Sequence, residues 1–230
     1  MTTVKLVSYT KPTEEFEQHG LQDAQDLIAF CARVSNPSSQ VNSETSEKLI
    51  KYLIKHQHWS PLEMVNVCLQ IKTTRDIARQ ILRHRSFSFQ EFSQRYADPT
   101  EDLENNFVNR DLRLQDPKNR QNSIELERTS ENLMKQMNFH ANQKKIVDKA
   151  VAFYKQAINE GVAKEQARCF LPEGLTISKL YMNGNLRSWI HYIQLRSANG
   201  TQKEHMEIAK ECARVIEKIF PLISKFVKNK

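Results

Sequence analysis

The sequence predicts an α+β domain with a mainly antiparallel sheet flanked by long helices. Stretches in which apolar residues alternate with other residues are scattered among longer stretches with the helical repeat. Neither a GxGxxG nor a GxxxxGK[ST] motif occurs, so neither a Rossmann fold nor a P-loop fold is indicated. A chain of 230 residues is long enough to bury a core, and we expect residues 1–230 to form one domain.

The first part of the chain predicts one strand, two helices and a turn. Residues 4–8 alternate in the way that is typical of a short strand. The stretch from Leu21 to Val34 predicts a helix, and Ser43 can cap a second helix whose apolar stripe spans 49–54. Pro61 disfavours helical backbone at the residue before it, which predicts a turn near this proline.

The middle of the chain predicts a strand, a helix and a long loop. Apolar residues alternate from Val65 to Ile71, which indicates a strand. A helix is expected over 74–83, with Ile77 and Ile81 on its apolar side. Residues 97–128 are rich in Asp, Glu, Asn, Arg and Gln and are expected to form a polar loop or insertion.

The last part of the chain predicts three helices and one more strand. A long helix is expected over 129–160, followed by a strand from Leu175 to about Tyr181. Asn183-Gly184 is typical of a turn and leads into a helix over 185–195. A final helix is expected over 202–220, where a proline follows.

Charge and composition restrict the class of partner. The formal net charge is +7, from 34 basic and 27 acidic residues, which favours anionic partners such as nucleotides, phosphorylated cofactors, nucleic acid or polyglutamates. Hydrophobic residues make up 39%, so part of the surface is expected to be open or to be buried only in an oligomer. The sequence has no secretory leader and no apolar run long enough for a transmembrane helix, so a cytoplasmic protein is expected.

The cysteines and histidines give no metal or disulfide pattern. Cys31, Cys68, Cys169 and Cys212 are far apart in the sequence, and we expect each to be a reduced, small buried residue. His56 and His58 have no partner at ligand spacing, so no metal is predicted.

The segment Arg83–Tyr96 concentrates arginines, serines, one carboxylate and aromatic side chains. Just before it, Arg75 and Arg79 precede Arg83 at intervals of four residues, which places all three on one face of a helix. A guanidinium donates two parallel hydrogen bonds to a phosphate. This segment is therefore a candidate anion site, although a solvated basic helix end is the simpler alternative.

The segment RHRSFSFQEFSQRY resembles the signature of the flavin-dependent thymidylate synthases, which is RHR followed by spaced serines and a closing arginine. Other parts of the chain between about 56 and 205 are similar to further elements of this family. They are His58-Trp59-Ser60-Pro61-Leu62-Glu63, Ala78-Arg79-Gln80, Arg168 with Leu171-Pro172, Asn185-Leu186-Arg187-Ser188, His191 and Leu195-Arg196. The chain departs from the family pattern at Gln57, Met64 and Gly200.

The resemblance implies a homotetramer with active sites between subunits. It implies reductive methylation of dUMP at C5, with tightly bound FAD as the hydride carrier and with 5,10-methylenetetrahydrofolate and NADPH as co-substrates. The residues that it assigns to FAD are Ser60, Arg83, His84, Arg85, Glu91, Asn185, Leu186, Arg187 and His191. Those that it assigns to dUMP are Gln80, Ile81, Leu82, Arg83, Glu91, Phe92, Ser93, Gln94, Arg95, Arg168 and Arg196.

Arg196 is the candidate catalytic residue that the resemblance implies. A guanidinium beside N3 and O4 of uracil would favour negative charge on the ring, which makes C5 nucleophilic. Arginine is a poor proton acceptor, so stabilisation of charge is favoured over base catalysis. Cys169 has no histidine near it in the sequence, and we predict no covalent adduct of a cysteine with dUMP.

Two other functions remain open at this point. A nucleic-acid-binding protein would use the basic charge, with Phe87, Phe89, Phe92 and Tyr96 stacking on bases. Glu91 argues against it, because a loop that follows phosphates gains nothing from a carboxylate. A flavoprotein reductase with no pyrimidine substrate is the third function.

Overall fold

Four antiparallel strands form the central sheet in the order β1-β2-β6-β3. They are β1 (Thr3–Tyr9), β2 (Asn66–Thr74), β3 (Ser88–Glu91) and β6 (Ile177–Asn185). The computed structural model describes residues 2–103 and 105–227. β6 pairs with β2 along its whole length and with β3 on its other side, so it joins the two halves of the sheet.

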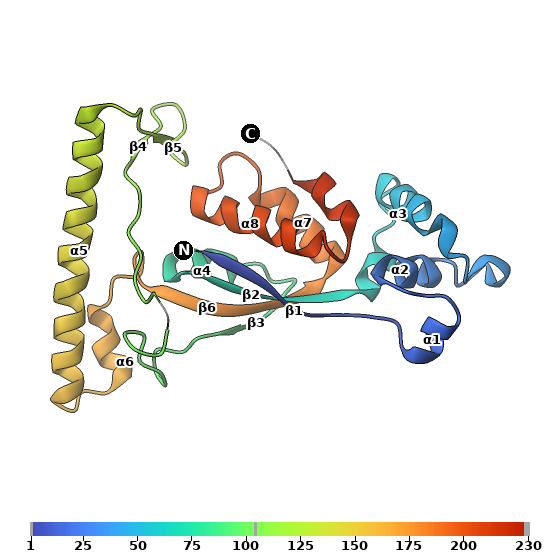
Figure 1. The fold of residues 1–230 in the computed structure, drawn as a ribbon, viewed down its shortest axis with the longest axis horizontal. Coiled ribbons are helices and arrows are strands. Elements are labelled where there is room, and N and C mark those ends of the chain that lie inside the picture. Colours follow the sequence, from blue (N-terminus) through green and yellow to red (C-terminus); the bar gives the residue numbers. More distant parts are fainter. Residues whose placement is uncertain (1, 104, 228–230) are drawn as a thin grey trace.

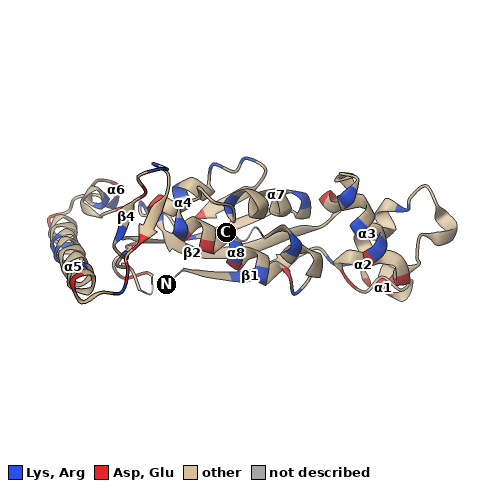
Figure 2. Cartoon of the chain, turned by 90° about the horizontal axis from the view of Figure 1, so that it is seen from above, with Lys and Arg blue, Asp and Glu red and all other residues tan. Residues whose placement is uncertain are grey.

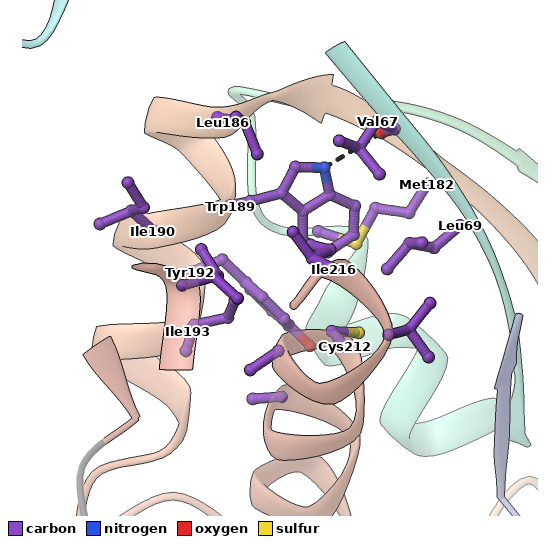
Figure 3. Packing of buried hydrophobic residues seen from close by; sticks show 14 of the residues in the cluster. Val67, Leu69, Met182, Leu186, Trp189, Ile190, Tyr192, Ile193, Cys212 and Ile216 are labelled. Carbon is purple, nitrogen blue, oxygen red and sulfur yellow. Dashed lines mark hydrogen bonds between the residues drawn. The ribbon is translucent and has the colours of Figure 1, made fainter. Parts of the chain in front are cut away.

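Two helices cover one face of this sheet (Figure 1). They are α7 (Leu186–Arg196), which follows β6 directly, and α8 (Lys203–Ile216). The indole of Trp189 is fully buried between them and the sheet, and its Nε1 donates a hydrogen bond of 3.0 Å to the carbonyl oxygen of Val67 (Figure 3). Alternate residues of β2, such as Leu69, are also fully buried, which explains the alternating sequence pattern.

Short helices and turns pack at one end of the sheet (Figure 1). They are α1 (Glu14–Gln18), α2 (Ala24–Ala32), α3 (Ser46–Lys55) and the 3-10 turns η1 (Pro37–Ser39), η2 (Ser43–Thr45) and η3 (Ser60–Met64). The Asp23 side chain caps α2 by accepting hydrogen bonds from two backbone N–H groups. The helix α4 (Arg75–Ile81) follows β2 and begins beside the sheet.

A long helix, α5 (Ser130–Asn159), stands at the opposite end of the molecule (Figure 1). With 30 residues it is about 45 Å long. Around it lie α6 (Lys164–Ala167), η4 (Arg168–Phe170) and a small hairpin of β4 (Arg113–Gln115) and β5 (Ser123–Glu125). Leu133, Met137, Ile146 and Phe153 of α5 are each more than half exposed, so much of its apolar surface is uncovered.

Most of the expected elements are present, and the differences are local. The strands at 4–8 and 65–71 and the long helix are confirmed. Missing from the expectation were α1, β3, the β4–β5 hairpin inside the polar stretch 97–128, and α6. The last helix ends at Ile216 and not at Phe220, and a 3-10 segment, η5 (Pro221–Phe226), follows it.

The expected turn at Asn183-Gly184 is wrong, because β6 continues through both residues to Asn185. The glycine is required here by close packing. A Cβ atom on Gly184 would lie 2.4 Å from Cδ1 of Phe87, so the ring of Phe87 occupies the space of a side chain.

Candidate active site

A cavity of about 550 Å³ opens beside α7. It is lined by Trp59, Glu63, Ser86, Asn185, Arg187, Ser188, Ile190, His191 and Gln194. These residues come from η3 and the residue before it, from the segment after α4, and from α7 and the residue before it. Three of the residues assigned to FAD by resemblance, Asn185, Arg187 and His191, therefore lie together.

The start of α7 fixes the position of these residues. The Asn185 side chain caps the helix by accepting a hydrogen bond of 2.9 Å from the backbone N–H of Ser188. Arg187 and His191 are four residues apart and share the helix face that lines the cavity. Arg187 forms an ion pair with Glu63 of η3, so the positive charge on this side of the cavity is partly balanced.

The Arg83–Tyr96 segment alternates between exposed and buried side chains. Arg83 and Arg85 are exposed, whereas His84 between them is buried. Phe87 is buried as well, and its ring packs edge-on against Trp189 with 4.8 Å between the ring centroids. His84 and Phe87 thus hold the segment against the core, while Arg83 and Arg85 face the surface.

Arg196, the candidate catalytic residue, lies at the end of α7 against His84. Its Nε donates a hydrogen bond of 2.9 Å to Nε2 of His84. Burial and then the positive charge of Arg196 lower the pKa of His84 to about 4, so the imidazole is neutral and can accept this bond. The contact uses only Nε, which leaves the two Nη groups as the donors for a ligand.

Glu91 lies among basic and hydroxyl groups. One carboxylate oxygen accepts a hydrogen bond of 2.8 Å from Ser178, and the other accepts one of 3.3 Å from Arg79. The buried Arg75 lies 3.9 Å from the same carboxylate. The three-arginine face expected from the sequence is divided here, because α4 ends at Ile81, before Arg83.

The residues that follow β3 contact α6. Nε of Arg95 donates a hydrogen bond of 3.1 Å to the carboxylate of Glu165, and Nε of Arg168 donates one of 3.2 Å to the backbone carbonyl oxygen of the same residue. Gln94 is buried, and its Nε2 has no hydrogen-bond partner among the described residues. Ser93 and Phe92 are half-buried in the same turn.

Gln80 belongs to a third group of polar residues, at the end of α4. Its Nε2 donates a hydrogen bond of 2.7 Å to Oε1 of Gln202, and its Oε1 lies 3.2 Å from Nδ1 of His205. Burial, followed by the charge of Arg196, lowers the pKa of His205 to about 3. Gln202 and His205 were not singled out in the sequence, although a histidine in the apolar stripe of α8 was a usable signal.

Some assigned residues bury their side chains elsewhere. Ile81 and Leu186 are fully buried in the hydrophobic core, so only their backbone atoms can reach a ligand. Leu82 is half-buried, and Ser60 is exposed at the start of η3. In this chain the candidate residues therefore form separate groups and do not line one pocket together.

The expectation that all four cysteines are small buried residues is only partly met. Cys212 is buried, Cys31 and Cys68 are half-buried, and all four thiols are free. The expectation is wrong for Cys169, which is exposed in the short η4 turn at the surface. Among the described residues, no group of three or more His, Cys, Asp or Glu side chains could hold a metal ion.

The surface offers little to support stacking on nucleic-acid bases. Phe87 is in the core, Phe89 and Phe92 are half-buried, and only Tyr96 of the four aromatics is well exposed. Basic and acidic residues are interspersed along the molecule in the view of Figure 2. No helix among the described residues is long and apolar enough to cross a membrane.

Comparison with known proteins shows the family. The family model described as "Thymidylate synthase complementing protein" matches residues 15–222. The chain is 45% identical over 223 residues to a probable flavin-dependent thymidylate synthase of Paramecium bursaria Chlorella virus 1, covering 97% of each chain. It is 44% identical to the flavin-dependent thymidylate synthase of Synechocystis, over 96% of this chain and 97% of the relative.

A solved structure shares the fold. The UMP/dUMP methylase PolB from Streptomyces cacaoi, bound with 5-Br dUMP, matches with a TM-score of 0.77 and 23% identity. The match covers 98% of this chain and 94% of that chain. At this level of identity the likeness concerns the arrangement of the strands and helices.

Proposed function

Because the chain belongs to the family of flavin-dependent thymidylate synthases, we propose that it catalyses the reductive methylation of dUMP to dTMP. The observation that carries this proposal is the cavity beside α7. It brings Ser86 of the signature segment together with Asn185, Arg187 and His191 of a segment about 100 residues later. Relatives with the family name match this chain along nearly its full length.

We propose FAD as the tightly bound cofactor and NADPH and 5,10-methylenetetrahydrofolate as co-substrates. The donor set of the cavity fits part of a flavin dinucleotide: Arg187 and the start of α7 suit a diphosphate, and Trp59 and Ile190 offer apolar surface to a ring. Ser60, Arg83, His84, Arg85, Glu91 and Leu186 remain assigned to the flavin by resemblance. When bound, the flavin supplies hydride chemistry, and the protein supplies position and electrostatics.

We propose that dUMP is held by two groups of residues. Arg95 and Arg168, which both contact Glu165, are suited to a phosphate because each guanidinium keeps its Nη donors. Gln80 and Arg196 are suited to the uracil ring, with Arg196 stabilising negative charge at N3 and O4. Ile81, Leu82, Phe92, Ser93 and Gln94 stay in the proposed site as neighbours of these residues.

No step of the proposed reaction uses a cysteine nucleophile. Burial raises the pKa of the Cys31, Cys68 and Cys212 thiols, which disfavours the thiolate form that attacks carbon. Cys169 is exposed but lies in the η4 turn, next to Phe170, which packs on α5.

We propose that the chain forms a homotetramer with active sites between subunits. Two observations support this. The candidate residues form separate groups in one subunit, which a neighbouring copy could bring together. On α5, Phe139, Ile146 and Phe153 are partly exposed at intervals of seven residues, a spacing that suits packing against another helix. We further propose a cytoplasmic location, which the four free thiols support.

The decisive experiment is a dTMP assay on protein stripped of flavin. The reaction contains dUMP, 5,10-methylenetetrahydrofolate and NADPH, with and without added FAD. We expect dTMP only when FAD is added. Folded protein that makes no dTMP in either case would refute the proposed function, and NADPH oxidation that is indifferent to dUMP would indicate a flavin reductase.

A further inference from the structure

A network of hydrogen bonds, in which each side chain donates to the next, connects Gln80 to residues of α7 and α8. It links Tyr192 of α7 to His205 of α8, then to Gln80, to Gln202 and finally to Glu204. The distances between the bonded atoms are 3.2, 3.2, 2.7 and 3.0 Å in that order. Tyr192 and His205 are fully buried, so these groups have no water to replace a lost partner.

Glu204 determines which group donates and which accepts in each of these hydrogen bonds. Glu204 is ion-paired with Arg110 and Arg113. Burial acts to raise the pKa of its carboxyl, but a hydrogen bond from its own backbone N–H, followed by the charges of these two arginines, holds the pKa below the usual value. An ionised carboxylate can only accept hydrogen bonds. Gln202 must therefore turn its Nε2 toward Glu204, and its Oε1 is then left to accept from Nε2 of Gln80.

The same reasoning fixes the tautomer of His205. With Nε2 of Gln80 facing Gln202, the Oε1 of Gln80 faces His205 and needs a donor. Nδ1 of His205 must carry the proton, and Nε2 then accepts from the Tyr192 hydroxyl. Burial keeps this hydroxyl protonated by raising the pKa of Tyr192, which agrees with its role as a donor.

Burial and the nearby charge of Arg196 favour the neutral form of His205 in this place. A protonated ring would have no acceptor at Nε2 for the tyrosine hydroxyl, and it would add a cation near Arg196. Its neighbour His84 packs with 6.2 Å between the two ring centroids and accepts from Arg196. Two buried neutral imidazoles thus stand directly behind Gln80 and Arg196.

We propose that His205 is a positioning residue, which holds the amide of Gln80 in one of its two orientations for recognition of dUMP. The inference rests on the proposed function, because Gln80 is a proposed dUMP contact. A flip of the Gln80 amide exchanges a donor for an acceptor toward the pyrimidine, and the Nδ1–H of His205 opposes that flip. His205 is not among the residues that the resemblance assigns to FAD or to dUMP.

Two substitutions of His205 separate this role from general packing. In His205→Asn, the side-chain amide reaches the place of Nδ1 and can still donate to Gln80. In His205→Gln, the longer side chain brings its amide to the place of Nε2, which keeps the Tyr192 partner and loses the Gln80 contact. Both variants are polar and shorten or reshape the same buried ring, so each controls for the other.

The measurement is the KM for dUMP in the reaction with 5,10-methylenetetrahydrofolate and NADPH, with kcat from the same reaction and the bound flavin content of the same protein preparation. We expect His205→Gln to raise KM about tenfold, the effect of one lost hydrogen bond of about 1.4 kcal/mol, with flavin content unchanged. His205→Asn should stay within about threefold of the wild type. In a Gln80→Ala background, His205→Gln should cause no further rise in KM.

Equal KM values for the Asn and Gln variants would overturn the inference, as would a full additional loss in the Gln80→Ala background. If either variant does not fold, direct binding of dUMP to Tyr192→Phe decides. That change removes the Tyr192 hydroxyl and leaves the His205 donor to Gln80 in place, so weakened dUMP binding would overturn the proposal, while unchanged binding together with weakened binding in His205→Ala would support it. Wild-type protein that binds no dUMP would refute the proposed function itself, whereas wild-type binding without the His205 effects refutes this inference alone.

Discussion

Replacing Gly184 by alanine adds a methyl group where the ring of Phe87 already lies. The added Cβ would be 2.4 Å from Cδ1 and 2.7 Å from Cε1 of Phe87, well inside ordinary contact distance. Because Phe87 packs against Trp189 and Tyr192, the ring can move away only by displacing other core side chains. Overpacking of this kind costs about 1–3 kcal/mol of the free energy of unfolding.

The assay is denaturant unfolding followed by circular dichroism at a fixed protein concentration, with thermal unfolding as a second measure. Each 1 kcal/mol should lower the melting temperature by about 2–4 °C for a domain of this size. Gly174→Ala is the matched control, since no atom lies within 4 Å of the added Cβ and its φ is not positive. Reducing the ring in Phe87→Leu should recover part of the loss in the Gly184→Ala background. Equal stability of the two alanine variants would refute the packing argument.

Four further results are expected. Arg196→Lys should keep bound FAD but lower kcat about a hundredfold or more, because an ammonium lacks the planar pair of donors of a guanidinium. A normal kcat would show that Arg196 does not stabilise charge on the uracil ring. Ser93→Ala and Arg95→Ala should weaken dUMP binding more than FAD binding in titrations of the two ligands, and a larger loss for FAD would contradict their placement. Glu91→Gln should lower the free energy of unfolding by about 1–3 kcal/mol, since buried Arg75 loses a charged partner. Urea unfolding measures this free energy, and an unchanged value would show that Arg75 does not depend on Glu91. The free energy of unfolding should decrease as the pH falls below about 6.5, by up to about 1.4 kcal/mol per pH unit for each of His84 and His205. The reason is that the pKa of each histidine is lowered in the folded protein, so the unfolded chain binds the proton more readily. A free energy of unfolding that does not change between about pH 6.5 and 5 would argue that these rings are not buried.

Elements with a strong periodic signal could be predicted from the sequence. β2 alternates cleanly because one of its faces is buried, and α5 was predicted to within about one residue at each end. The weak elements depend on tertiary contacts. β3 is four residues long and pairs only with β6, so its own sequence carries little pattern. Asn183-Gly184 has the composition of a turn, and nothing in the local sequence shows that the ring of Phe87 packs against the Cα atom of Gly184.

The candidate site was predictable in its parts and not in its connections. The motifs indicated Arg187, His191 and the signature segment, and the structure shows the cavity that joins them. The contact of Arg196 with His84 joins residues 112 positions apart, and sequence spacing cannot reveal it. The positions of Trp59 and Gln194 in the lining of the cavity could not be predicted either, because they depend on how η3 and α7 pack together. Cys169 was expected to be buried because free cysteines usually are, but it lies exposed in the η4 turn.

The central position of β6 also has a consequence for folding during synthesis. The β1–β2 pair can form as soon as residue 74 has left the ribosome, but the other edge of β2 stays open until β6 is made, more than 100 residues later. At about 5–20 residues per second, that delay is on the order of 5–20 s, during which the backbone N–H and C=O groups on this edge of β2 have no strand partner. We therefore expect the growing chain to be most prone to pairing with other chains between the synthesis of β2 and that of β6.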